Sequence, residues 1–205
     1  MSKLAALYEA ESARIGALAG GAHEGDYAHP VFGEGPARPA LMFIGEAPGR
    51  EEAESARPFV GRAGRQLDEM LALAGIARET VFVTNAVKFR PVKMRARRVS
   101  NRTPLPRETD ASLALLGAEI ALISPRFIAT LGNTPLYAVM KLCGAQRTSV
   151  GSIHGRPLDI EIEGNGYTLF PLYHPASGIY DRGLIPLMKE DLVNLGALIR
   201  EETHA

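Results

Sequence analysis

Short, unbroken runs of apolar residues alternate along the chain with longer stretches of helical periodicity. The apolar runs predict strands at 40–44, 80–84 and 126–131. The spacing of leucine, methionine and isoleucine predicts helices at 64–74 and 106–122. A short run that is apolar at every position is typical of a strand buried on both faces of a parallel sheet. Because the predicted strands and helices alternate, we expect an α/β fold: three α/β/α layers with a central, mainly parallel four-stranded sheet.

The last third of the chain changes its pattern. Apolar and acidic residues alternate from Leu158 to Glu163, which predicts an edge strand. Gly164-Asn165-Gly166 predicts a turn, and 167–173 predicts the last strand. A helix at 186–201 closes the chain.

Three further segments are predicted from local signals. Residues 1–18 suit a short amphipathic helix, and 50–64 reads as a long loop. A helix is expected to begin around Asn133 or Thr134, with one of these as its N-cap and Pro135 in the first turn, and to end near Gly144.

Composition limits the classes of protein that fit. The 205 residues are 46% hydrophobic, show no repeat or linker, and predict one domain spanning 1–205. The single cysteine, Cys143, excludes an intramolecular disulfide and any metal site built from cysteine alone. No stretch has transmembrane length, and charges throughout residues 1–18 argue against a signal peptide. We expect a monomeric cytoplasmic protein of bacterial type, acting at the nucleoid, without a membrane partner.

The formal net charge is zero, but the positive charge is concentrated in one segment. Between 88 and 107 there is no acidic residue and there are eight basic ones: Lys88, Arg90, Lys93, Arg95, Arg97, Arg98, Arg102 and Arg107. A basic loop on a neutral protein is typical of a surface that binds a phosphate backbone. A solvated loop without a partner would show the same pattern.

Polar side chains follow three of the predicted strands at the point where each strand ends. They are Glu46, Asn85 and His174. Since the carboxyl ends of parallel strands share one edge, we expect these side chains around one cleft, where open α/β sheets bind ligands. Phe59, in a loop bounded by glycine and proline, would add a stacking face. Taken singly, the four have structural interpretations: a helix-entry charge, a turn cap, a rim histidine and a core residue.

The residues around these positions resemble the motifs of a known family. Gly45-Glu-Ala-Pro-Gly49, Arg57-Pro-Phe-Val-Gly-Arg-Ala-Gly64, Thr84-Asn-Ala-Val-Lys88 and Tyr173-His-Pro-Ala-Ser177 are similar, in order and spacing, to those of the uracil-DNA glycosylase superfamily, above all its family 4. The resemblance runs from about Val31 to the final helix. It implies a base excision repair enzyme that cuts flipped-out uracil from deoxyribose in single-stranded, mismatched or duplex DNA and leaves an abasic site.

The resemblance also implies roles for individual residues. Glu46 and His174 would be catalytic, and uracil would be held by Gly45, Ala47, Phe59, Asn85 and His174. The implied DNA contacts are Pro48, Gly49, Lys88, Arg97, Arg98, Arg102, Pro175, Ala176 and Ser177. The loop after His174 would fill the vacated base stack through Ile179 or Tyr180.

The chain departs from family 4 at its cysteines. Members of that family typically hold an iron–sulfur cluster on four cysteines, but here the early pair is absent. Phe89 stands where one later cysteine would be, and Ser112 or a neighbour stands where the last would be. Without thiolates we expect no cluster, no cofactor and no metal, and apolar packing around residues 1–30 and Phe89 instead. A related branch forms a covalent bond to the abasic product through a histidine in its basic loop. Asn101 falls near that position, so we expect ordinary turnover.

Two other functions fit the same motifs. A glycosylase that prefers hypoxanthine or xanthine would keep the fold and alter the pocket. A non-catalytic sensor of damaged DNA would keep the pocket and lose hydrolysis. A nucleotide-phosphate site is disfavoured because the P-loop Lys-Ser/Thr pair is absent.

Overall fold

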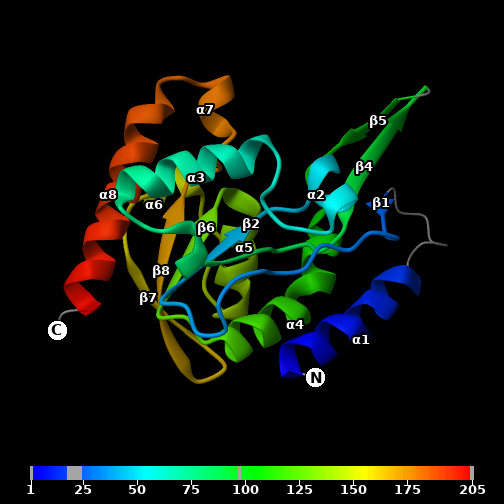
Figure 1. Cartoon of the computed structure of the whole chain (residues 1–205), viewed down its shortest axis with the longest axis horizontal. Coiled ribbons are helices and arrows are strands. Elements are labelled where there is room, and N and C mark those ends of the chain that lie inside the picture. The colour runs from blue at the N-terminus through cyan, green and yellow to red at the C-terminus, as the bar shows by residue number, and fades with distance from the viewer. Residues whose placement is uncertain (1, 18–24, 97, 204–205) are drawn as a thin grey trace.

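The computed structural model describes residues 2–17, 25–96 and 98–203, and its centre is a five-stranded sheet of order β3-β2-β6-β8-β7 (Figure 1). The strands are β2 (Leu41–Gly45), β3 (Phe82–Asn85), β6 (Phe127–Leu131), β7 (Leu158–Ile162) and β8 (Asn165–Leu172). The first three and β8 run parallel, and β7 pairs antiparallel with β8. The α/β fold with a mainly parallel sheet is confirmed. The sheet has five strands because the antiparallel edge strand joins the four parallel ones.

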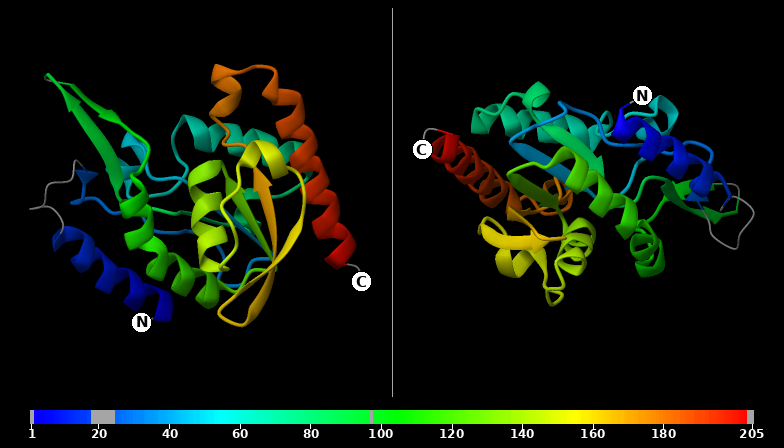
Figure 2. Two further views of the ribbon diagram at one scale, coloured as in Figure 1. Left: turned by 180° about the vertical axis from the view of Figure 1, so that it is seen from behind. Right: turned by 90° about the horizontal axis from the view of Figure 1, so that it is seen from below.

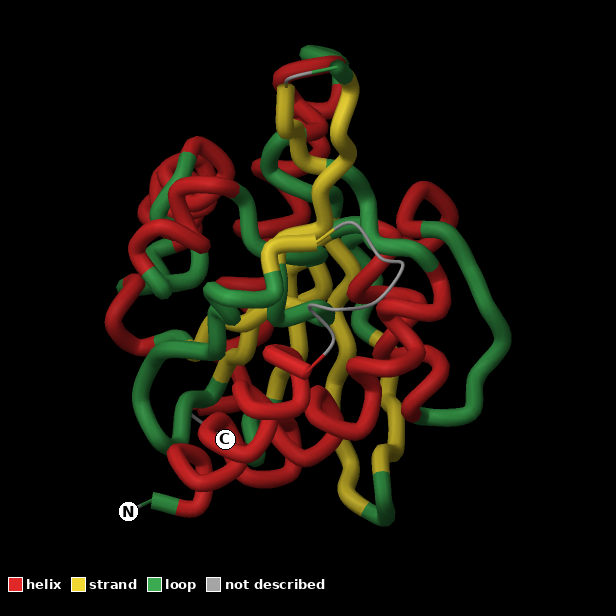
Figure 3. Tube along the Cα trace, turned by 90° about the vertical axis from the view of Figure 1, so that its right-hand side faces the viewer, coloured by secondary structure: helices red, strands yellow, loops and turns green. Residues whose placement is uncertain are grey.

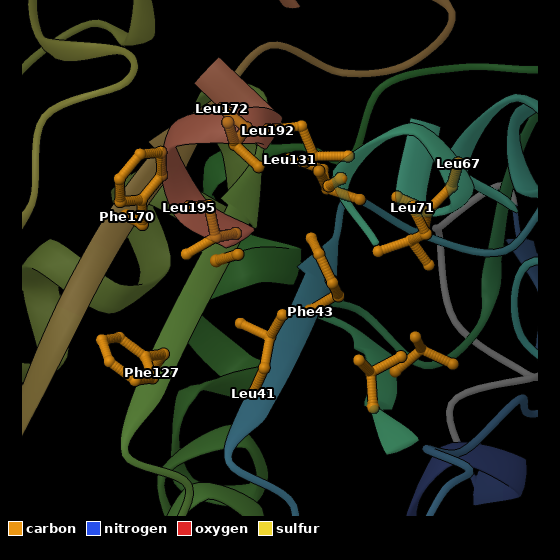
Figure 4. Close-up of a cluster of buried hydrophobic side chains, with 14 of the residues drawn as sticks. Leu41, Phe43, Leu67, Leu71, Phe127, Leu131, Phe170, Leu172, Leu192 and Leu195 are labelled. Atoms are coloured by element: carbon orange, nitrogen blue, oxygen red, sulfur yellow. The ribbon is translucent and has the colours of Figure 1, made fainter. Parts of the chain in front are cut away.

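Alternation along β2 shows how the sheet is buried on both faces. Leu41 and Phe43 point into one apolar cluster, and Met42 and Ile44 point into another. The first face is covered by α3 (Arg62–Ala74) and α8 (Leu184–Thr203), whose leucines pack on the strands in Figure 4. The second face is covered by α4 (Pro106–Ile123), α5 (Asn133–Leu142) and α6 (Val150–Ile153). The three-layer arrangement is therefore confirmed (Figure 2).

The amino-terminal helix α1 (Lys3–Ala17) packs outside α4 (Figures 1 and 2). Ile15 of α1, Tyr27, Val87 and Phe89 form a separate buried apolar cluster. The rings of Tyr27 and Phe89 lie 4.6 Å apart between centroids. Apolar packing around Phe89, the position that the resemblance associates with a cluster cysteine, is confirmed.

The basic segment is a β-hairpin, so the prediction of a loop is wrong. Strands β4 (Arg90–Arg95) and β5 (Arg98–Asn101) pair antiparallel, and the short β1 (Gly25–Asp26) pairs with β4. The hairpin projects from the body in Figures 1 and 3. The missed signal is a period of two, in which Val92 and Met94 alternate with basic residues.

Three local predictions also need correction. The stretch 50–64 contains helix α2 (Arg50–Ser55), because two carboxylates follow Gly49 in its first turn. The β7–β8 turn is Glu163-Gly164, with both φ angles positive (50° and 79°), so Asn165 already belongs to β8. Helix α5 begins at Asn133 with Gly132 as its N-cap, because the Asn133 and Thr134 side chains bond elsewhere.

The remaining elements are a 3-10 helix η2 (Arg78–Thr80) and a short helix α7 (Ser177–Tyr180). Within the described ranges, none of the helices combines the length and the apolar character needed to cross a bilayer.

Candidate active site

An open cleft of about 730 Å³ lies at the carboxyl ends of the parallel strands. Its lining includes Glu46 after β2, Asn85 at the end of β3, His174 after β8, and Phe59 from the loop before α3. The volume is in the range of ligand-binding pockets. The structure therefore brings together the four side chains that the sequence placed around one cleft.

Gly45 sits between two of these side chains. It pairs with Asn85 across β2 and β3. A Cβ atom on Gly45 would lie closer than 3.0 Å to Asn85 Oδ1 and to the Phe59 ring, a separation that side chains essentially never show. Only glycine therefore lets the Asn85 amide and the Phe59 ring approach each other at the cleft.

Phe59 is held in an uncommon backbone conformation. Its φ is +57°, and its side chain is buried in the cluster that contains Phe43. Gly64 fits directly against the Phe59 carbonyl, where a Cβ atom would overlap it. Glu52 ties this loop to the first motif, because its carboxylate accepts the amide protons of Gly61 (2.8 Å) and Gly49 (3.1 Å). Left-handed backbone at a non-glycine residue is concentrated at functional sites.

Glu46 is a half-buried carboxylate with hydroxyl partners. The Thr134 hydroxyl donates to Glu46 Oε2 at 2.8 Å. Burial raises the pKa of Glu46 above its ordinary value, and hydrogen bonds from Thr134 and Thr103 oppose that rise. A carboxylate held this way can orient water or stabilise a positive charge developing next to it.

His174 is held as a neutral imidazole with a defined tautomer. Burial lowers its pKa below the ordinary 6.5. The backbone amide of Ala176 donates to His174 Nδ1 at 3.1 Å, so the proton of the neutral ring is on Nε2. Nε2–H is therefore the donor that the ring offers to a ligand.

Two implied DNA contacts have other roles in the structure. The prediction that Lys88 contacts DNA is wrong. Only 1% of the Lys88 surface is exposed, and its ammonium forms an ion pair with Glu119 at 2.6 Å. The Arg102 guanidinium forms a two-pronged ion pair with Glu108, both distances 2.7 Å, although Arg102 also lines the cleft. Arg97 lies outside the described residues.

The backbone amides expected to meet phosphate already donate within the protein. Gly49 N–H donates to Glu52, Ala176 N–H to His174 Nδ1, and Ser177 N–H to the His174 carbonyl (2.8 Å). Pro48, Gly49 and Ala176 do line the cleft, whereas Pro175 is buried and is not part of the lining.

Several residues in or next to the cleft were not predicted from sequence to belong to the site. Thr134 and Glu52 act through contacts across the fold, so no local pattern indicated them. Arg90, Val99 and Ser100 of the hairpin line one wall with Arg98 and Asn101. Tyr180 of α7, which the sequence did suggest for the vacated base stack, is 90% exposed and also lines the cleft. The hairpin and α7 both lie at the top of Figure 1, over the strand ends. Within the described part of the chain, no three histidine, cysteine or acidic side chains are grouped to hold a metal ion.

Comparisons with known proteins agree with the motifs. A sequence model described as "Uracil DNA glycosylase superfamily" matches residues 32–193. The chain is 38% identical over 162 residues to the type-4 uracil-DNA glycosylase of Pyrobaculum aerophilum, covering 79% of each chain. It is 36% identical over 174 residues to that of Thermotoga maritima, covering 84% of each.

A more distant relative is the type-5 uracil-DNA glycosylase of Mycobacterium tuberculosis, at 30% identity over 177 residues, 81% of this chain and 65% of the relative. The resemblance drawn from the four motifs is confirmed by a family match over most of the chain and by the type-4 relatives. This chain belongs to the uracil DNA glycosylase superfamily.

Proposed function

We propose that this protein is a DNA repair enzyme that hydrolyses the N-glycosidic bond of flipped-out uracil and leaves an abasic site. The observation that carries the proposal is the meeting of Glu46, Asn85 and His174 at one cleft of ligand size. The type-4 names of the relatives point to the same substrate. An enzyme that acts on a base must take it out of the stack, so the cleft would receive a single extruded nucleotide.

The chemistry assigns complementary tasks to the two ends of the cleft. The C1′–N1 bond breaks, its electron pair leaves on uracil, and the sugar acquires oxocarbenium character. His174 Nε2–H donates to uracil O2 and stabilises the departing anion. Glu46, as a carboxylate, orients the water that adds to C1′ and stabilises the cationic sugar. The water leaves its hydroxyl on C1′, and the proton that it loses is balanced by the proton that the uracil anion takes up to become neutral uracil.

Asn85 would select the base. Its side-chain oxygen accepts from uracil N3–H while its NH2 group donates to O4. Cytosine presents the opposite groups at both positions, so both contacts would become repulsive, and a site of this kind discriminates by about four decades. Phe59 stacks on the ring, which is worth roughly 1–3 kcal/mol per base.

DNA would be bound from two sides of the cleft. The hairpin supplies Arg90 and Arg98 on one wall, and α7 supplies the exposed Tyr180 on the other. The exposure of Tyr180 at the cleft supports a role for it in filling the space that the flipped base leaves. Flipping is cheapest where the base is unpaired, so single-stranded and mismatched uracil are the better substrates.

The test is incubation with an end-labelled oligonucleotide that contains one uracil, followed by alkali. Cleavage at the uracil position supports the enzyme, and tight binding without cleavage supports a damage sensor. Parallel substrates with hypoxanthine or xanthine decide the alternative specificity. The resemblance puts Asn101 near the histidine that bonds covalently to the abasic product in the related branch, and the Asn101 side-chain oxygen accepts from Arg90 at 2.7 Å. We therefore expect that no covalent DNA adduct survives a denaturing gel.

A further inference from the structure

A buried ion pair lies directly beneath the base-reading asparagine. Lys88 and Glu119 are 1% and 0% exposed, and their charged atoms are 2.6 Å apart. The Lys88 ammonium also donates to the Thr84 hydroxyl (2.5 Å) and to the backbone carbonyl of Asn85 (2.7 Å). All three protons of the ammonium therefore have acceptors, one of which belongs to Asn85 itself.

Glu119, on α4, is also fully engaged, and its partners come from two other parts of the chain. It accepts from Lys88, from the Thr84 hydroxyl (2.9 and 3.1 Å) and from the hydroxyl of Tyr8 on α1. Tyr8 in turn stacks on Phe32, with ring centroids 4.5 Å apart. The network thus connects β3, α4 and α1 at the end of the strand that carries Asn85.

Stability alone is a poor reason for this arrangement. Removing two charges from water carries a large free-energy cost, and well-packed apolar residues in their place are often as stable. What an apolar pair cannot do is hold the Asn85 carbonyl. The Asn85 side chain lies against Gly45, so a small rotation of its backbone would move the amide relative to a bound base.

We propose that Lys88 is a positioning residue: paired with Glu119, it fixes the backbone of Asn85 and thereby the orientation of the amide that reads uracil. The inference rests on the proposed function, because it assigns Lys88 a task within the same site. It replaces the DNA contact expected of Lys88 with a role inside the protein.

The test compares the Lys88→Met variant with the double variant Lys88→Met/Glu119→Gln. The single variant leaves Glu119 buried without its cation, so both stability and uracil binding fall. The double variant removes both charges, so its melting temperature recovers, but the Asn85 carbonyl still lacks its donor. The readouts are the melting temperature, the single-turnover rate on single-stranded uracil DNA, and inhibition by free uracil.

A positioning role predicts that inhibition by free uracil stays about tenfold weaker in both variants, the equivalent of one missing hydrogen bond. Ile123→Ala, a buried apolar truncation on the same helix as Glu119, should lower the melting temperature yet keep the wild-type inhibition constant. Recovery of uracil inhibition together with stability in the double variant would overturn the inference and leave the proposed function intact. A wild-type protein that neither releases nor binds uracil would overturn both.

Discussion

The backbone amide of Ala176 donates to Nδ1 of His174 across 3.1 Å, within the turn that leads from β8 into α7. This hydrogen bond and the burial of the ring both favour the neutral form of the imidazole. Burial lowers the pKa of His174, and the amide is available only to an unprotonated Nδ1. The local structure therefore holds His174 as a neutral imidazole that donates from Nε2 before any substrate binds.

The pH dependence of uracil release follows from these two groups. Because the pKa of His174 is lowered, the single-turnover rate should stay level as pH falls through 6.5, the ordinary histidine value. It should decline at more acidic pH, where His174, whose pKa is lowered, and Glu46, whose pKa is raised above 4.5, take up protons. Single-turnover rates measured from neutral pH to below 4.5 check where the decline begins. A decline centred on 6.5 would mean that His174 titrates as an ordinary histidine.

Glu46→Gln should make the protein more stable at neutral pH. The folded state raises the pKa of Glu46, so it binds the proton more tightly than the unfolded state does. Above the folded pKa the buried charge thus costs stability, and below 4.5, the unfolded value, this cost is absent. Thermal melts should show a higher midpoint for the variant at neutral pH and a shrinking difference at acidic pH. A lower midpoint at neutral pH would contradict the assigned cause of the shift.

Gly45→Ala should block the base pocket. The added methyl group would meet Asn85 Oδ1 and the Phe59 ring at less than 3.0 Å, so one of them must move out of place. We expect uracil release to fall by about two decades, comparable to the removal of one preorganised hydrogen-bond donor. Gly166→Ala on β8 is the matched control, because its Cβ atom would meet open space. Equal rates in the two variants would mean that Gly45 has no role in the pocket.

The hairpin should give DNA binding its dependence on salt. Lys93 and Arg98 lie on paired strands of the projecting hairpin, and Arg98 lines the cleft. Changing both to glutamine should reduce the slope of log affinity against log salt by about one for each phosphate that is no longer neutralised. Arg126→Gln, at the opposite end of the sheet, is the control. An unchanged slope in the double variant would remove the hairpin from the interface.

The sheet and the cleft were predictable from sequence because their signals are local. Each buried strand is a short apolar run, and strand exits in a parallel sheet share one edge, so Glu46, Asn85 and His174 could be placed together without coordinates. The main helices were also predictable from local signals, because their apolar positions recur at helical spacing and their ends carry glycine or proline.

Other features depend on contacts between distant segments. Lys88 looked like one more cation of a basic segment, but its partner Glu119 lies 31 residues away on α4. Thr134 looked like a helix cap, but its hydroxyl bonds to Glu46, 88 residues away. The hairpin was missed for a different reason: its alternating pattern was present, but the density of charge favoured a loop.

The account depends most on three side chains acting on one flipped nucleotide in one cleft. The most direct measurement is single-turnover uracil release by Glu46→Gln, Asn85→Ala and His174→Ala, made alongside the affinity of each variant for the same uracil-containing oligonucleotide. The account predicts that each variant loses about two decades or more of rate while its DNA affinity stays near that of the wild type. Release at close to the wild-type rate by any one of the three would contradict it.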